Sequence, residues 1–370
     1  MKIVANREKL HRGLQRLGGV VGTSAQQPIY RHVKLETVEE GLCLSATDLE
    51  VGLALTVSDV EVQEGGAILV PHDRLSPVLG ATPDEQVELT EDDGAVVILT
   101  ENSRFRLLGE DPSDFSPLPE MSEQGVVEID PEILAYMVRR TAFATADEKG
   151  RYALHGVLCV IGKEDTIELV AADGARLAHV RKKASNPDGI ETEFIVPREG
   201  LEQLAHLADY GSGPVRFAED EGRLVAENDA GRFVCQLVEG QFPNFREVIP
   251  TESKITVQLA TGNLLNAVRR ASYMTTEETQ VVDFAFEDDL LTITAESPDV
   301  GRAELKMPIE YDGEPAEISF NPEFLQEMLS VVEREAVKIR FTDRRSPCVI
   351  KCGMDYTYVV SPVIREDAEL

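Results

Sequence analysis

One sequence pattern occurs three times in this chain of 370 residues. A short β-branched or apolar run stops at Pro71, Pro197 or Asn321, and a helical pattern with a leucine four positions later follows. Proline fits the start of a helix and asparagine caps it, so each copy predicts a strand that leads into a helix. The three heads lie 126 and 124 residues apart, and units of this length fill the chain.

Other segments keep the same period. Arg104-Phe105 recurs as Arg232-Phe233, and the run Leu44 to Asp48 matches the runs that end at Asp173 and Glu296. The period is far longer than the roughly 20–50 residues of solenoid repeats, and each unit can bury its own core. Proline-containing exits place the boundaries, and the expected domains are residues 1–122, 123–251 and 252–370.

The hydrophobic periodicity predicts an α+β fold with two helices and several antiparallel strands in each unit. The expected helices span residues 6–17, 72–80, 131–145, 197–208, 262–274 and 322–332. The strand candidates include residues 87–89, 95–100, 167–171, 224–227, 290–295 and 337–341.

Composition indicates a soluble protein. The hydrophobic share is 42% and the mean hydropathy is −0.16, and no run of 18 apolar residues predicts a membrane helix. The first ten residues lack the apolar core of a signal peptide. Five cysteines without a CxxC pair fit reduced, structural thiols, so a cytoplasmic location without membrane contact is expected.

The sequence has no signature of an enzyme or of a bound cofactor. GxSxG, HExxH, P-loop and GxGxxG motifs are absent, and the six histidines lack the spacing of metal ligands. With 67 acidic residues, paired carboxylates arise by chance and do not indicate glycoside hydrolysis. We therefore expect no catalytic residue, no metal and no cofactor, and an acidic β-rich hydrolase remains only an alternative.

Positive charge is concentrated on helices of a chain whose net charge is −31. Lys9, Arg12 and Arg16 share one face of the first expected helix, whose neighbouring face is leucine-rich. Arginine pairs end the third and fifth helices, at positions 139–140 and 269–270. Two interpretations stay open: these arginines complement the helix dipoles, or the helices share one side that faces a polyanion.

These features bring the chain close to a known family. The segments Ala46–Glu50, Ser103–Phe105, Asp173–Leu177, Ile195–Arg198, Val238–Pro243 and Tyr358–Ile364 occur in order and with matching spacing. Through them the chain resembles the bacterial DNA polymerase III β subunits, the processivity sliding clamps, over its whole length. The resemblance implies three clamp domains per chain and a head-to-tail homodimeric ring around double-stranded DNA, with helices inside and sheets outside.

The resemblance also implies DNA-contacting residues on the helices and on one loop. They are Lys9, Arg12, Arg16, Arg74, Arg139, Arg140, Arg151, Tyr152, Arg198, Arg269 and Arg270. Two departures from the family, Ala153 in place of a second tyrosine and Glu199 in place of a lysine, lead us to expect weaker salt-dependent attraction to DNA.

A peptide-binding pocket between the second and third domains is implied as well. Its matching positions are Leu154, Gly174, Ala175, Arg176, Leu177, Pro243, Val248, Val359, Val360, Ser361, Pro362 and Val363. Apolar walls and one polar marker suit such a groove, although Leu154, Leu177 and Val360 fit a plain core equally well. Ala175, Glu247 and the acidic tail at 366–370 depart from the family, which predicts a shifted preference and weaker binding of acidic peptides.

The resemblance finally implies a subunit interface and a set of partners. The interface residues are Arg104, Phe105, Arg106, Leu107, Tyr273, Met274, Glu296, Asp299 and Glu304, with Arg302 as a departure among the acids. The implied partners are the DNA polymerase III alpha subunit, the clamp-loader delta subunit, and translesion, mismatch-repair and ligase proteins that carry a clamp-binding motif. A non-DNA scaffold on the same threefold fold is the second alternative.

Overall fold

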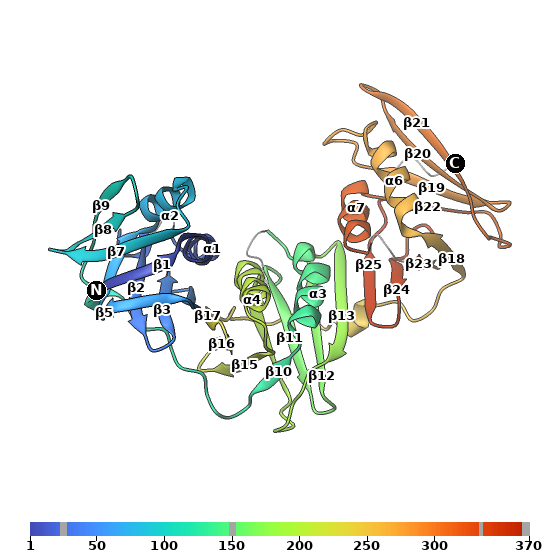
Figure 1. Cartoon of the computed structure of the whole chain (residues 1–370). Helices are drawn as coiled ribbons and strands as arrows, with labels where there is room; N and C mark the ends of the chain where they lie inside the picture. Colours follow the sequence, from blue (N-terminus) through green and yellow to red (C-terminus); the bar gives the residue numbers. More distant parts are fainter. Residues whose placement is uncertain (23–27, 148–152, 333–335, 365–370) are drawn as a thin grey trace.

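Three similar units follow one another along an arc in the computed structural model of this chain, which describes residues 1–22, 28–147, 153–332 and 336–364. Figure 1 shows the long helices on the inner side of the arc and the sheets on its outer side. Each unit contributes one pair of packed helices, α1 with α2, α3 with α4, and α6 with α7. The predicted α+β class and the threefold repeat are confirmed.

All six expected helices are present. The long helices are α1 (Arg7–Leu17), α2 (His72–Ala81), α3 (Pro131–Thr141), α4 (Arg198–Tyr210), α6 (Thr261–Ser272) and α7 (Pro322–Val331). The short ones are α5 (Phe245–Val248), η1 (Pro28–Arg31), η2 (Pro112–Asp114) and η3 (Ala142–Ala144). The expectation of one helix over 131–145 is wrong, because α3 ends at Thr141 and its last turn tightens into the 3₁₀ turn η3.

The predicted change from strand to helix occurs at each of the three repeat heads. Pro71 and Pro197 are the N-cap residues of α2 and α4, and each also ends a strand. Asn321 caps α7, and its side-chain oxygen accepts a hydrogen bond of 2.9 Å from the Glu323 amide. The first helices of units one and two are capped by Asn6 and Asp130 in the same way.

The described strands form four antiparallel sheets. Sheet I has the order β5 (Val60–Glu64), β1 (Lys2–Asn6), β7 (Gln86–Asp92), β8 (Ala95–Leu99), β9 (Arg104–Leu108). Sheet II has the order β10 (Val127–Ile129), β15 (Val215–Asp220), β16 (Arg223–Asn228), β17 (Gly231–Gln236), β4 (Val51–Val57), β3 (Gly41–Thr47), β2 (His32–Val38), β6 (Ala67–Pro71).

Sheets III and IV complete the outer layer. Sheet III has the order β14 (Thr192–Pro197), β11 (Gly156–Gly162), β12 (Thr166–Ala172), β13 (Arg176–Lys183), β25 (Tyr356–Val360), β24 (Cys348–Cys352), β23 (Ala336–Phe341), β18 (Ile255–Ala260). Sheet IV has the order β21 (Gly301–Pro308), β20 (Leu290–Ser297), β19 (Val282–Glu287), β22 (Ala316–Phe320).

Neighbouring units share a sheet. In sheet II, β4 of the first unit pairs with β17 of the second, and Leu53 faces Phe233. In sheet III, β13 of the second unit pairs with β25 of the third, and Ala178 faces Tyr358. We call these two junctions the 1–2 seam and the 2–3 seam. At the two ends of the arc, β9 and β21 are edge strands with an unpaired side.

The core lies between the sheets and the helices. Leu10, Leu14 and Leu17 of α1 are fully buried, as the leucine face of the first helix predicts. All five cysteines are free thiols, and four of them are buried. Burial raises the pKa of Cys235 and of Cys348 to about 12, so both thiols stay protonated and unreactive. Among the described residues, no helix has the length and apolar character needed to cross a membrane.

Candidate functional site

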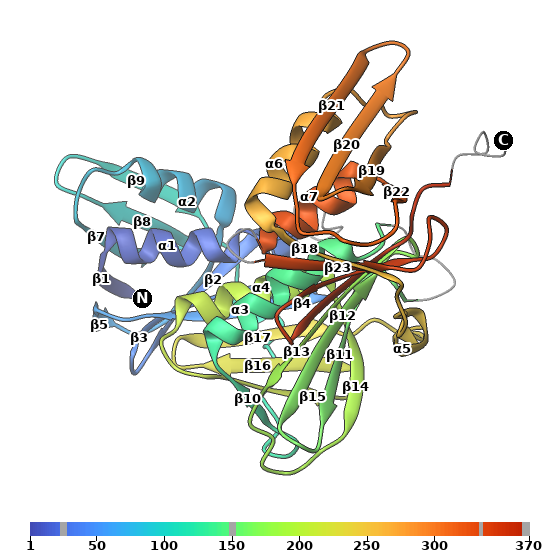
Figure 2. The same ribbon diagram turned by 90° about the vertical axis from the view of Figure 1, so that its right-hand side faces the viewer.

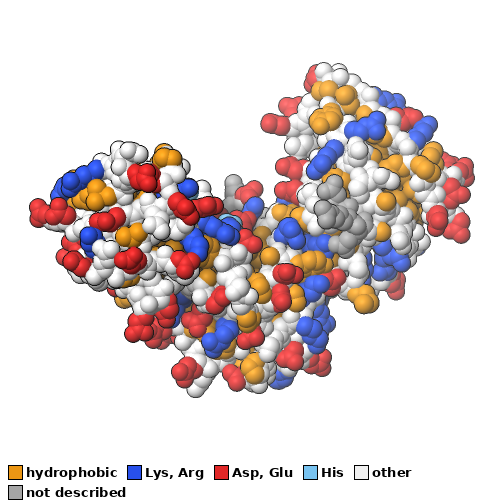
Figure 3. Space-filling view, in the orientation of Figure 1, with side chains coloured by type: hydrophobic (Ala, Val, Ile, Leu, Met, Phe, Trp, Pro, Cys, Tyr) orange, Lys and Arg blue, Asp and Glu red, His pale blue; other side chains and the backbone are white. Residues whose placement is uncertain are grey.

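The concave face carries most of the basic side chains predicted to contact DNA. Lys9 and Arg12 are exposed on α1, and the guanidinium of Arg12 lies 5.8 Å from the centre of the Tyr210 ring on α4. Arg16 forms an ion pair of 2.8 Å with Asp209. Figure 3 shows basic side chains beside the hollow of the arc, together with acidic ones. Exposed arginines on the other helices are Arg74, Arg139, Arg198, Arg269 and Arg270, of which Arg198 is only partly exposed.

Arg140 does not lie on this face, and the prediction that it contacts DNA is corrected. Its side chain is buried, with only 4% of the residue exposed. The guanidinium lies 3.9 Å from the centre of the Tyr136 ring and 5.6 Å from that of Tyr356 in the third unit. Arg140 therefore packs across the 2–3 seam. The other two predicted contacts, Arg151 and Tyr152, lie outside the described residues.

A second apolar cluster covers the outer face of sheet III. Because strand residues alternate between faces, Ala178 and Tyr358 pack under the helices, whereas Leu177 and Val359 pair on the opposite side. This outer cluster is separate from the main core. Its members are Ala153, Leu158, Val170, Ala172, Leu177, Ile195, Phe245, Val349 and Val359, with Leu154, Val160, Val238, Phe242 and Ile249 partly buried around them.

The alternation corrects the prediction for two pocket residues. Arg176 pairs with Val360 in the register of β13 and β25, and both lie on the helix side of the sheet. Val360 is fully buried in the main core. The Arg176 guanidinium binds Asp173, the Phe143 carbonyl and Glu327 of α7, so it is a link between domains and does not mark the groove.

A tight loop and the C-terminal segment form one rim of the outer groove. Gly174 has a φ of +98°, which favours glycine, and Asp173 Oδ1 accepts hydrogen bonds of 2.9 Å from the amides of Ala175 and Arg176. The Ser361 amide donates to the Ala175 carbonyl at 2.8 Å. Beyond the half-buried Pro362, the Val363 amide donates to the Ser319 carbonyl of β22.

The opposite rim is the linker between the second and third domains. It includes the half-buried Pro243 and the short helix α5, which Figure 2 shows apart from the long helices. Phe245 of α5 is buried in the outer cluster, whereas Val248 is 49% exposed. Three members of the outer cluster, Phe245, Ile195 and Val349, were not among the predicted pocket residues. The alternation of apolar residues in the strands of Ile195 and Val349, and the Phe-Pro turn before Phe245, could have indicated them.

An ionic cluster supports α5 from the sheet. His179 Nε2 lies 2.9 Å from Glu168 Oε2, and Arg246 donates to the same carboxylate at 3.2 Å. The imidazole also lies 5.3 Å from the Phe245 ring. The hydrogen bond from His179 holds the pKa of Glu168 below its usual value, although burial opposes the shift. These contacts fix the helix that carries both Phe245 and Val248.

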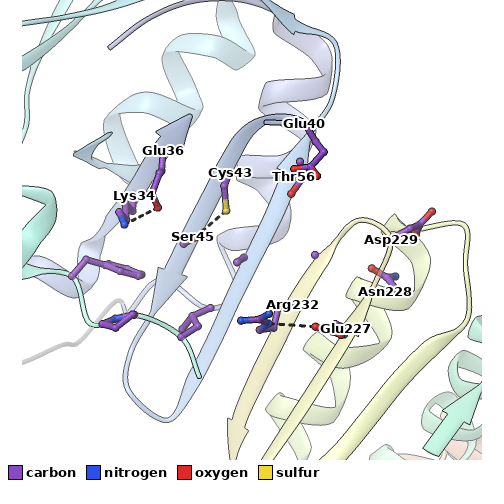
Figure 4. Close-up of a pocket in the computed structure, with 15 residues that line it drawn as sticks. Lys34, Glu36, Glu40, Cys43, Ser45, Thr56, Glu227, Asn228, Asp229 and Arg232 are labelled. Atoms are coloured by element: carbon purple, nitrogen blue, oxygen red, sulfur yellow. Dashed lines mark hydrogen bonds and ion pairs between the residues drawn. The ribbon is translucent and has the colours of Figure 1, made fainter. Parts of the chain in front are cut away.

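The equivalent outer face at the 1–2 seam has a different chemistry. A hollow of about 500 Å³ lies there, bordered by the linker residues Phe115 and Leu118 (Figure 4). Its floor carries the ion pairs Lys34–Glu36 at 2.7 Å and Arg232–Glu227 at 3.5 Å. Covering charged groups with an apolar side chain costs desolvation energy, so only the 2–3 seam suits an apolar anchor.

The two ends of the arc expose apolar side chains. On β9, Phe105 is 37% exposed and Leu108 is 70% exposed, while the predicted Leu107 packs partly against the core. At the other end, Tyr273 after α6 is 73% exposed and Val300 before β21 is 48% exposed. Leu108 and Val300 were not among the predicted interface residues. Of the other predicted ones, Met274 packs partly on the core, and Arg104, Arg106, Glu296, Asp299 and Glu304 are exposed.

Comparison with known proteins shows the family. Residues 1–119, 128–244 and 246–363 match the models of the N-terminal, central and C-terminal domains of the DNA polymerase III beta subunit. The chain belongs to the DNA polymerase III beta subunit family. The beta sliding clamp of Chlamydia muridarum is 30% identical over 99% of this chain and 100% of its own length. That of Vibrio cholerae is 30% identical over 98% and 100%.

Solved structures of the family agree with this assignment. A sliding clamp of Pseudomonas aeruginosa bound to griselimycin has a TM-score of 0.92 and 29% identity, over 99% of this chain and 100% of that one. The Thermotoga maritima beta subunit has a TM-score of 0.89 and 26% identity over 98% and 99%. Sliding-clamp function in DNA replication therefore extends to this chain as a member of the family.

Proposed function

We propose that two copies of this chain close head to tail into a ring that encircles double-stranded DNA, slides along it and tethers the replicative polymerase. The observation that supports this most is the pair of unpaired edges, β9 at one end of the arc and β21 at the other. By the internal repeat, β9 is equivalent to β17 and β25, and β21 is equivalent to β4 and β13. These equivalent strands already pair with each other at the 1–2 and 2–3 seams. Both copies would then use the same joint, which pairs the free edges of β9 and β21 and leaves neither end of the arc open.

The register of this joint follows from the 1–2 seam. In sheet II, Arg232 faces Ala54 and Phe233 faces Leu53. Arg104-Phe105 repeats Arg232-Phe233, and the pairing of β20 with β21 repeats that of β3 with β4. Carrying the register over sets Arg104 opposite the partner's Glu304, and Phe105 opposite the partner's Ala303.

The exposed apolar side chains support the same joint. Phe233 and Tyr358, the repeat equivalents of Phe105 in the two internal seams, are both fully buried. Phe105 is 37% exposed because its edge is free. Pairing with a second chain would bury Phe105 as its two equivalents are buried, together with Leu108, Tyr273 and Val300.

The concave face supports encirclement of a duplex. The described residues form six long helices per chain, which makes twelve in a dimer. Twelve cylinders about 10 Å wide, set side by side, form a circle of roughly 38 Å in diameter. This width holds a duplex and a layer of water. Basic side chains on such a lining contact phosphates and read no sequence, and few of them are needed because closure of the ring prevents escape.

The outer groove at the 2–3 seam supports the binding of partner peptides. Its floor of Leu177 and Val359 and its exposed Val248 offer apolar surface beside backbone groups of the C-terminal segment. We propose that it accepts short motifs of the DNA polymerase III alpha subunit, the clamp-loader delta subunit, and translesion, mismatch-repair and ligase proteins. The protein then acts in the cytoplasm without catalysis of its own, and its domains meet near residues 122 and 251.

The test is retention on DNA of two topologies. The protein is loaded by its cognate clamp loader on nicked circles, half of which are then linearised by a restriction enzyme. Retention on circles with loss from linear ends is the expected result and indicates topological linkage. Equal retention on both forms, or binding to neither, would contradict the proposal and favour direct DNA binding or a scaffold without DNA.

A further inference from the structure

A crevice between α1 and α4 concentrates basic and polar side chains on the concave side of the 1–2 seam. It encloses about 670 Å³ and is lined by Arg7, His11, Arg12, Arg16, Gln203 and His206, among others. Glu8 is the only acidic side chain among the described residues that line it. The crevice therefore presents an anionic ligand with several donors and little opposing charge.

The donors of the crevice are only partly engaged. Arg16 is held by Asp209 at 2.8 Å, and the Arg7 Nε lies 3.4 Å from the Asp84 carbonyl. Arg12 is exposed, and within the described part of the chain it forms no ion pair and lies 5.8 Å from the centre of the Tyr210 ring. An incoming phosphate can therefore bind Arg12 without first breaking an ion pair within the chain.

Among the described residues, the concave side of the 2–3 seam offers fewer free donors, with Arg139 of α3 exposed there. There Arg140 is buried and Arg176 is bound to Asp173 and Glu327. Helix α7 on that side contributes Glu323 and Glu327 and no basic residue. Over the part of the chain that the structure describes, the positive lining of the arc is thus uneven, and the 1–2 seam carries more free basic groups.

We infer that the crevice between α1 and α4 binds a backbone phosphate of the encircled duplex, and that protonation of His206 strengthens this contact. The inference rests on the proposed function and adds to it a defined contact point and a regulatory input. A duplex held at this point lies closer to the 1–2 seam than to the 2–3 seam of each chain.

His206 has the surroundings of a proton-linked contact. Its side chain is exposed, and its Nδ1 lies 3.4 Å from Gln203 Oε1. Partial burial and the nearby Arg16 hold the pKa of His206 below its usual value, while Glu202 and Asp209 oppose the shift. The charged and titratable groups around it are Arg7, Glu8, His11, Arg12 and Arg16 on α1, and Glu202 and Asp209 on α4.

The direction of the pH effect follows from linkage. With its pKa lowered, His206 is neutral in the free protein near pH 7.5. A bound phosphate stabilises the imidazolium, so the pKa rises in the complex and a proton is taken up on binding. Affinity for DNA therefore increases as the pH falls from 7.5 to 6.0.

The experiment measures the dissociation constant of the dimeric protein for a 30-base-pair duplex by fluorescence anisotropy, at several salt concentrations and at pH 7.5 and 6.0. For the unchanged protein we expect binding to tighten several-fold at pH 6.0. Arg12→Gln should weaken binding at both pH values and reduce the salt slope by about 0.9, the value for one phosphate contact. His206→Gln should remove most of the pH dependence.

Two matched controls lie on the outer layer. Arg223→Gln removes an exposed arginine at the start of β16, and His32→Gln removes a histidine at the start of β2. A pH response that His206→Gln leaves intact, or an equal salt-slope change in Arg12→Gln and Arg223→Gln, would overturn the inference. If circles still retain the protein in that case, the clamp function stands and only the crevice is wrong.

Discussion

The guanidinium of Arg176 binds the carboxylate of Glu327, so that one side chain of the second domain holds a helix of the third. Its Nε also donates to Asp173 at 2.9 Å, its Nη2 donates to the Phe143 carbonyl at 3.0 Å, and its carbon Cζ lies 4.4 Å from the centre of the Phe324 ring. Burial opposes the charge, but the hydrogen bond to Glu327 raises the pKa of Arg176 above its usual value. This link stiffens the 2–3 seam beneath the outer groove.

Replacement of Arg176 by methionine should destabilise the 2–3 seam. The side chain is 8% exposed, and its loss leaves Asp173, at 17% exposure, without its strongest partner. We expect the free energy of unfolding to fall by about 2–4 kcal/mol, because removing one partner of a buried ion pair leaves the charge of the other partner buried and uncompensated. Urea unfolding measures this change. Glu327→Gln, which keeps a hydrogen-bond acceptor on a 40% exposed side chain, should cost clearly less, and equal losses would contradict the link.

Phe105→Ala should weaken the dimer and leave the fold of the single chain intact. The Phe105 side chain is 37% exposed in the single chain, and the proposed pairing of β9 with a second copy would bury it. Losing a buried phenylalanine at an interface costs about 2–3 kcal/mol, which corresponds to a dissociation constant raised about 30- to 150-fold. Sedimentation equilibrium gives the constant, and a dimer as tight as that of the unchanged protein would contradict the β9–β21 joint.

Arg302→Gln should tighten the dimer at low salt. The register of the joint sets Arg302 opposite the like-charged Arg106 of a second copy, and Arg302 also lies 3.9 Å from Glu304, the expected partner of Arg104. Removing this charge relieves repulsion and frees Glu304. We expect a gain of about threefold to tenfold in dimer affinity, which salt screens out. A gain that is independent of salt would argue against this electrostatic cause.

Val248→Asp should lower the affinity of the outer groove for a peptide from the cognate polymerase alpha subunit. The side chain is 49% exposed on α5, so the change places a charge on the rim with little effect on stability. We expect a loss of about tenfold by isothermal titration calorimetry, because the peptide must then cover a carboxylate. Val62→Asp, at a 39% exposed valine of β5, is the matched control and should bind as the unchanged protein does.

Glu168→Gln should reduce stability only above the acidic range. The hydrogen bond from His179 lowers the pKa of Glu168 in the folded protein. The ionised carboxylate therefore stabilises the fold fully at pH values above the pKa that Glu168 has in the unfolded chain. This contribution is lost as the pH falls through the lowered folded pKa. We expect a difference of about 1 kcal/mol at pH 7 that disappears once the pH lies below the lowered folded-state pKa, measured by urea unfolding. A difference that persists in acid would exclude this origin.

The strand ends, helix starts and buried helix faces could be predicted because each depends on a short local sequence pattern, and the pattern recurs in the three units. Pro71, Pro197 and Asn321 end a strand and begin a helix at equivalent points, and the leucines of α1 show its buried face directly. Pairing between units is different, because nothing in the strand β4 itself states that its partner is β17, which lies far along the chain. That pairing depends on how the first and second units pack against each other in the folded chain.

The site was predicted by residue type more reliably than by orientation. Arg139 and Arg140 are identical neighbours, yet a helix rotates by about 100° per residue, and only Arg139 reaches solvent. Arg176 and Leu177 are neighbours on a strand and therefore point to opposite faces of sheet III. The phase of each element relative to its buried residues decides these cases, and Leu134, Met137 and Val138 carried that signal for α3.

The joints of the proposed ring are not mechanically equal. Four of its six seams lie within a chain, where a linker and side chains such as Arg176 bind the two sides together. The remaining two have no covalent tether and set Arg106 against the partner's Arg302. A load that bends the ring therefore concentrates at those two places, which act as its parting lines. The same sheet geometry would thus give a ring that is stiff along most of its circumference and opens at either of two equivalent joints.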